Sequence, residues 1–121
     1  MAGFQLTDGG NLLTIQQGAT FSLSVNYQTS AGSTVDLSSG YSARMQGRTN
    51  HDDSSTIFSL TSPSNITLAS SSPNVVIRME ASATDDFTAP SVGVYDLELV
   101  QGANVFRILE GSYRITPEVT R

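Results

Sequence analysis

The sequence predicts an all-β domain built as two stacked antiparallel sheets. The first observation is a long hairpin pattern in which residues 93–100 and 105–116 form two alternating apolar runs, separated by four residues that include Gly102. The second is residues 20–27, where Phe21, Leu23, Val25 and Tyr27 alternate with polar residues. The third is the near absence of helical periodicity. Together these favour a sandwich with the long hairpin at its centre.

The remaining elements follow in order as short apolar runs between turn residues. A possible short edge strand precedes turn-rich residues 6–11, and further strands are predicted at 12–15, 20–27, 41–48, 56–60, 65–68 and 75–79. Val35 and Leu37 should tuck against the edge of the core, and 70–74 is a turn. Residues 81–87 predict one helical turn with Ser82 or Thr84 as its cap. About eight strands at this spacing predict an immunoglobulin-like β-sandwich.

Length and composition set the domain count and exclude several classes of protein. A chain of 121 residues predicts a single domain over 1–121. No cysteine is present, so disulfides and thiolate metal sites are excluded. The net charge is −5 and the six basic residues are dispersed, which argues against nucleic acid as a partner. No apolar run long enough to span a membrane occurs, and residues 1–5 lack a signal-peptide pattern. We therefore expect a protein made in the cytoplasm that does not enter a membrane.

No group of residues in the sequence has the pattern of a catalytic or metal-binding site. His51 is the single histidine, and its neighbours Asp52 and Asp53 could help it hold a cation, but no second His or Cys is available as a ligand, which favours a solvated loop histidine. Asp52–Asp53 and Asp85–Asp86 are pairs of adjacent carboxylates. Adjacent side chains of an extended chain point to opposite faces, so neither pair forms a catalytic dyad by itself. We expect no catalytic residue, no cofactor, no metal and no enzymatic activity.

Three segments carry a resemblance to a known group of proteins. Residues 41–46 after the Asp36–Leu37 turn, the strand 93–99 and the ending 110–121 resemble a group of small tailed-bacteriophage virion proteins. That group is loosely similar to the N-terminal domain of phage upper baseplate proteins, which open with a Gln-Gly-x-Thr-Phe-like strand, here residues 17–21. The similarity spans about 14–121. It implies a β-sandwich that serves as an assembly part of the virion, with no catalytic residues to carry over.

The resemblance leaves three functions open. The chain stops where baseplate proteins continue into a receptor-binding segment, so the first expectation is a docking module at the tail, baseplate or neck. The second is a capsid decoration protein that clamps shell subunits. The third is a module that binds host-surface glycans, which would need a concave patch with an exposed Tyr or Phe beside Asp or Asn. Either virion role implies many copies in contact with other virion proteins or with each other, made in the host cytoplasm and located in the virion.

The end of the chain is the predicted partner interface. Pro117 follows the last strand, so residues 116–121 should form an extended tail that leaves the sheet and lies on a neighbour, with which Arg121 and the terminal carboxylate would pair. A solvated, frayed end is the alternative. The edge strands and the loops 29–33 and 50–55 are further candidate contacts. The predicted interface residues are Thr116, Pro117, Glu118, Val119, Thr120 and Arg121.

Overall fold

The computed structural model describes residues 12–119, which form eight strands and one short helix. In chain order the elements are β1 (Leu13–Gln16), β2 (Phe21–Val25), β3 (Ser42–Arg48), β4 (Phe58–Thr61), β5 (Ile66–Leu68), β6 (Val75–Met79), α1 (Ala81–Thr84), β7 (Ser91–Gln101) and β8 (Asn104–Thr116). The possible edge strand within residues 1–5 lies outside the described residues.

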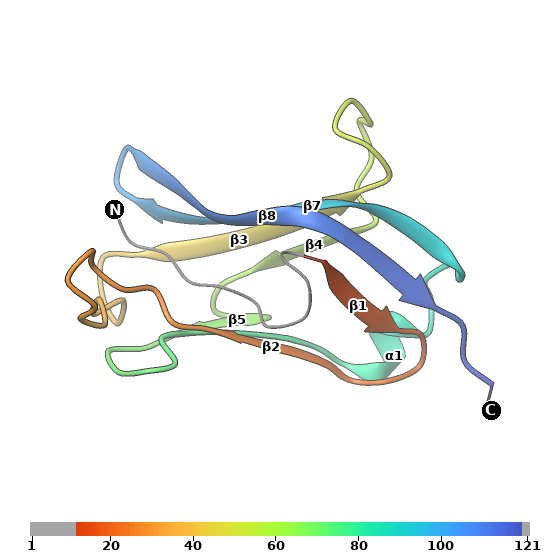
Figure 1. The fold of residues 1–121 in the computed structure, drawn as a ribbon, viewed down its shortest axis with the longest axis horizontal. Helices are drawn as coiled ribbons and strands as arrows, with labels where there is room; N and C mark the ends of the chain where they lie inside the picture. Colours follow the sequence, from red (N-terminus) through yellow and green to blue (C-terminus); the bar gives the residue numbers. More distant parts are fainter. Residues whose placement is uncertain (1–11, 120–121) are drawn as a thin grey trace.

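The strands form two layers (Figure 1). One sheet has five strands in the order β1-β8-β7-β3-β4, and the other has three in the order β2-β6-β5. Alternate side chains of both sheets point into the space between them and form a single core. The predicted immunoglobulin-like sandwich of about eight strands is therefore confirmed. The buried apolar residues are Leu13, Ile15, Phe21, Val25, Leu37, Ala43, Met45, Phe58, Leu60, Ile66, Val75, Ile77, Met79, Tyr95, Leu97, Leu99, Leu109, Tyr113 and Ile115.

One strand pairing differs from the purely antiparallel prediction. β1 runs parallel to β8, with Leu13 opposite Tyr113 and Gln16 opposite Thr116. The physical reason is the turn after β1, where Gly18 adopts a positive φ of 79° and the chain crosses to the other sheet. β1 therefore cannot form a hairpin with β2, and its backbone groups pair with the last strand instead.

The β7–β8 hairpin is confirmed as the longest strand pair, and it contains a β-bulge. Glu98 lies opposite Arg107 while Leu97 lies opposite Leu109, so Ile108 is an extra residue on β8. A bulge of this kind reverses the alternation of side chains beyond it. Arg107 consequently faces outward and Leu109 faces the core, although the two residues are only two positions apart.

Aromatic rings cover glycines beneath the five-stranded sheet. Phe58 lies opposite Gly47, and a Cβ atom on Gly47 would collide with the Phe58 ring. Tyr113 lies opposite Gly93, where a Cβ atom would collide with the carbonyl oxygen of Arg48 and with the Tyr113 ring. The two rings meet edge to face, with centroids 5.4 Å apart. Each glycine thus leaves room for a ring that a larger residue would displace.

The buried Asn74 side chain joins loops on the side of the three-stranded sheet. Its Oδ1 accepts a hydrogen bond from the backbone N–H of Tyr27 at 2.7 Å. Its Nδ2 donates to the carbonyl oxygens of Tyr27 at 2.9 Å and of Val35 at 2.7 Å. Asn74 therefore bonds both ends of the 27–35 segment, which pairs with itself through Gln28 and Thr34 but joins neither sheet. Leu37, which follows this segment, is buried as predicted, and Val35 is half-buried.

The predicted helical turn exists, but its predicted cap is wrong. Glu80 occupies the N-cap position of α1, and no side chain caps the helix. Thr84 lies in the last turn, is fully buried, and donates its hydroxyl to the carbonyl oxygen of Ala19 at 2.7 Å. Its role is to fasten α1 to the turn between β1 and β2.

Candidate interaction surface on the five-stranded sheet

The outer face of the five-stranded sheet carries a set of five charged side chains, which we call the charge ladder. It consists of Arg44 from β3, Asp96 and Glu98 from β7, and Arg107 and Glu110 from β8. The strand register sets Glu98 between Arg44 and Arg107, and Asp96 beside Glu110. Because outward and core positions alternate along each strand, all five project from the same face.

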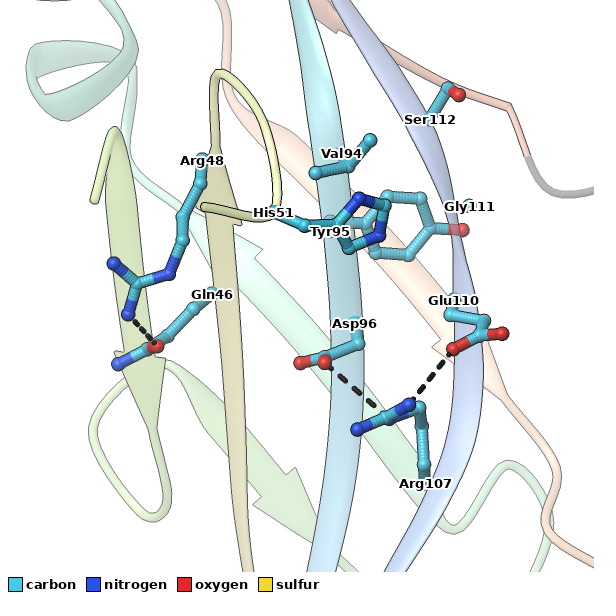
Figure 2. A pocket seen from close by; sticks show the side chains of 10 residues that line it. All are labelled: Gln46, Arg48, His51, Val94, Tyr95, Asp96, Arg107, Glu110, Gly111 and Ser112. Carbon is cyan, nitrogen blue, oxygen red and sulfur yellow. Dashed lines mark hydrogen bonds and ion pairs between the residues drawn. The ribbon is translucent and has the colours of Figure 1, made fainter. Parts of the chain in front are cut away.

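Arg107 is the centre of the charge ladder. Its guanidinium lies 3.5 Å from Asp96 Oδ2, 3.2 Å from Glu110 Oε1 and 3.7 Å from Glu98 Oε2. Figure 2 shows the Arg107 side chain between Asp96 and Glu110. On the other side, Arg44 Nε donates to Glu98 Oε1 at 2.8 Å. Glu98 is therefore held from two sides, and its side chain is only 16% exposed.

The charge ladder has more carboxylates than guanidiniums. Burial raises the pKa of the Asp96 carboxyl above its ordinary value, and the negative charges of Glu98 and Glu110 add to the rise. Arg107 and Arg44 oppose it but do not cancel it. Three carboxylates share two guanidiniums, so the ladder retains an excess of negative charge near neutral pH. A positively charged group from a partner would offset that excess.

An open depression of about 500 Å³ lies beside the charge ladder (Figure 2). Its floor includes Val94 and Ser112, a pair of short side chains on neighbouring strands. Longer side chains of the ladder and the loop after β3 rise around it. The residues that line it are Gln46, Arg48, His51, Val94, Tyr95, Asp96, Arg107, Glu110, Gly111 and Ser112.

Arg48 holds the wall of the depression in place. Its Nη2 donates to Gln46 Oε1 at 3.0 Å, and its Nη1 donates to the carbonyl oxygen of Asp53 at 2.9 Å. These bonds fasten the loop after β3 to the sheet. His51 lies on that loop and lines the rim of the depression. The predicted solvated loop histidine is confirmed, since His51 is exposed, but its position above β7 was not foreseen.

The acidic pairs do not converge on a shared centre. Asp52 and Asp53 lie in the loop after β3, whereas Asp85 and Asp86 follow α1. Among residues 12–119, no group of three or more His, Cys, Asp or Glu side chains is placed to hold a metal ion. The same part of the chain contains no helix of the length and apolar character needed to cross a membrane.

The predicted tail interface is partly held by the chain itself. Thr116 still belongs to β8 and lies opposite Gln16, so the tail does not leave the sheet there. The backbone N–H of Glu118 donates to Gln17 Oε1 at 3.1 Å, which continues this attachment beyond Pro117. Val119 is 93% exposed. Thr120 and Arg121, the other predicted interface residues, lie outside the described residues.

Sequence reasoning missed the charge ladder as a unit. The alternation of Asp96 and Glu98 with apolar residues did indicate an outward-facing acidic stripe on one strand. The missing information was which basic residues lie opposite, because that depends on strand order and on the bulge in β8. No local signal in the sequence gives either.

Comparison with known proteins shows no family for this chain. No family model matches the chain, and no curated protein is found as a relative. Solved structures do match. One, described as the structure of murine CRIg, covers 90% of this chain and 93% of its own, with 11% sequence identity and a TM-score of 0.42. At this level the match tells nothing about binding or activity, and the two-sheet topology itself remains the basis for describing this chain as an immunoglobulin-like sandwich.

Proposed function

We propose that the protein is a non-enzymatic structural component of a tailed-phage virion, and that it docks other virion proteins at the tail, baseplate or neck. Docking takes place through the outer face of the five-stranded sheet. The observation that carries this proposal is the charge ladder beside an open depression, on a face built from the longest strands of the molecule.

The chemistry of this face suits protein recognition. Arginine is enriched in protein interfaces because its guanidinium can bond several acceptors at once, and here Arg44, Arg48 and Arg107 stand on one face. Each already bonds a neighbour on this face, so part of its side-chain freedom is lost before a partner binds. Charge pairs of this kind favour the correct partner over wrong ones more than they add raw affinity.

The shape of the face also agrees with a protein partner. A broad, open depression with a polar rim can receive one or two side chains from a partner surface. Tyr95 lines the depression but is 4% exposed, so it offers no ring face on which a sugar could stack. This observation favours a protein partner over a glycan.

Localisation on the particle tests the proposed function. An epitope tag inserted at Ser71 would sit in an exposed turn of the opposite sheet, away from the charge ladder. Antibody-gold electron microscopy of particles made by the phage that encodes the chain should show label at the tail, baseplate or neck. Label spread over the head would favour the capsid decoration alternative. A protein absent from purified particles would overturn the virion role, and glycan-array binding in that case would favour the third alternative.

A further inference from the structure

A second recess, which we call the end cleft, lies at the end of the sandwich nearest α1. It has a volume of about 420 Å³. Apolar and aromatic residues (Ile57, Phe87, Val92 and Tyr113) and polar ones (Thr49, Thr56, Asp86, Thr88 and Ser91) both line it. Ile57 and Val92 are among the most exposed large apolar residues of the described chain, at 42% and 70%. These two exposed β-branched side chains form an apolar patch that gains free energy when another apolar group covers it.

The segment after β8 starts at the same end of the molecule. One side chain links the two features: Gln17 donates through Nε2 to the carbonyl oxygen of Phe87 at 2.8 Å, and its Oε1 accepts from the N–H of Glu118 at 3.1 Å. The backbone up to Glu118 is therefore held next to the end cleft. Val119 follows with 93% of its surface exposed, so it does not occupy the cleft of its own chain.

Charge complementarity identifies an occupant for the end cleft. Asp86 lines the cleft, and its carboxylate forms no ion pair with any residue between 12 and 119. Arg121 comes two residues after Val119 in the sequence, a span of about 7 Å when extended. An apolar side chain followed by a cation is the complement of a recess that carries exposed apolar side chains and an unpaired carboxylate.

We propose that residues 117–121 of one copy bind the end cleft of a second copy, with Val119 packed against Ile57 and Val92 and with Arg121 paired to Asp86. The two halves of this contact differ, so every copy can give one segment and receive another, and the assembly closes as a ring or continues as a row. The end cleft and the charge ladder share no residue. It goes beyond the proposed function and does not rest on it.

Reversing the charges of Asp86 and Arg121, singly and together, tests the proposed contact between copies. Analytical ultracentrifugation of the full chain should show concentration-dependent self-association. Asp86→Arg and Arg121→Asp should each raise the dissociation constant by at least about tenfold, because an attraction becomes a repulsion. The double variant should recover association, and so should a mixture of the two single variants. Val119→Ser should weaken association, whereas Val105→Ser, at the exposed hairpin tip, is the matched control and should not.

The mixture of the two single variants also distinguishes binding between copies from binding of the segment to the cleft of its own chain. If the segment folded into the cleft of its own copy, mixing the two single variants would restore nothing. That result would overturn the proposal, as would a wild-type chain that sediments as a monomer at all concentrations. A circular dichroism spectrum and melting curve for each variant keep loss of association distinct from loss of fold.

Discussion

The two sheets share one core, yet their outer faces differ in kind. The three-stranded sheet presents small hydroxyl residues, Ser22, Ser24 and Thr67, and one ion pair between Arg78 and Glu80, whose side chains are both more than half exposed. The five-stranded sheet presents the charge ladder. The difference shows that burying a core explains only the inner face of each sheet, and that the fixed charges on one outer face need a separate explanation.

The inner faces differ as well. Beneath the five-stranded sheet, rings occupy the space that Gly47 and Gly93 leave open. On the side of the three-stranded sheet the core is mainly aliphatic, and its irregular neighbours are held by the amide of Asn74. Packing beneath the five-stranded sheet thus requires glycines that leave room for the rings, whereas the loops beside the three-stranded sheet require a hydrogen-bonding side chain. The stability of the two regions should therefore respond to different substitutions.

The largest expected effect is at Gly93. Gly93→Ala places a methyl group against the carbonyl oxygen of Arg48 and the Tyr113 ring, and because the backbone cannot move aside easily we expect a loss of about 3 kcal/mol in the free energy of unfolding. Gly47→Ala meets only the Phe58 ring and should cost less. Urea denaturation of both variants measures the difference, and equal losses would contradict the packing described here.

Asn74→Ala comes next. It removes three hydrogen bonds and leaves the N–H of Tyr27 and the carbonyl oxygen of Val35 without the Asn74 partner, while the carbonyl oxygen of Tyr27 keeps its bond from the N–H of Val35, and we expect a loss of about 2 kcal/mol. The matched control is Asn65→Ala, which removes a single exposed bond of 3.3 Å to the carbonyl oxygen of Arg78 and should change the free energy of unfolding by no more than about 0.5 kcal/mol. Thermal or urea unfolding compares them. An Asn74 variant as stable as the Asn65 variant would show that the loops are held by other contacts.

We expect a smaller difference between the coupling free energies of the ion pairs on the two outer faces. A double-mutant cycle for Arg44 and Glu98 should give a coupling free energy of about 0.5 to 1 kcal/mol, because the Glu98 side chain is largely shielded and held from two sides. The same cycle for Arg78 and Glu80 should give a value near zero, since both side chains are exposed. If both cycles gave the same value, the distinction between fixed and solvated charges would fail.

The smallest expected effect is a pH dependence of opposite sign at two aspartates. The pKa of Asp96 is raised in the folded protein, so its ionised form costs stability at neutral pH, and that cost disappears as the pH falls through the pKa. The hydrogen bonds from Ser38 lower the pKa of Asp36, so its ionised form adds stability above the ordinary Asp pKa, and this is lost at lower pH.

Substitution by asparagine makes both contributions measurable. At pH 7, Asp96→Asn should be slightly more stable than wild type and Asp36→Asn slightly less stable. Both differences should shrink below the ordinary Asp pKa of about 3.9. Urea unfolding from pH 3 to pH 7 checks the signs, and a destabilising Asp96→Asn at pH 7 would mean that the attraction of Arg107 outweighs burial.

Much of the fold follows from local sequence patterns. The strand at Val75–Met79, the long hairpin and the half-buried strand that begins at Phe21 all show the alternation that a sheet with one buried face requires. β4 begins at Phe58 instead of residue 56, and β2 covers only Phe21–Val25 of the predicted 20–27. The alternation continues to Tyr27, but the backbone of Tyr27 bonds the Asn74 side chain instead of a strand.

The features that escaped prediction depend on distant parts of the chain. The sequence predicts Asn74 as a turn residue and Thr84 as a helix cap, because these residue types favour such positions locally. In the structure each side chain instead bonds the backbone of a segment that is distant in sequence. Simple alternation places Arg107 and Leu109 on one face, and only the bulge separates them. The candidate surface was therefore beyond local reasoning, since it needs the bulge and the strand order together.

We propose that the chain docks onto other virion proteins through the outer face of the five-stranded sheet. Complementation of a phage that lacks this protein, followed by quantification of the protein in purified particles, tests it directly with Arg107→Glu on the charge ladder and Arg78→Glu on the opposite sheet, both checked for an unchanged melting curve. We predict that Arg107→Glu is lost from particles and that Arg78→Glu is incorporated like wild type. Equal incorporation of both variants, or selective loss of Arg78→Glu, would contradict the claim.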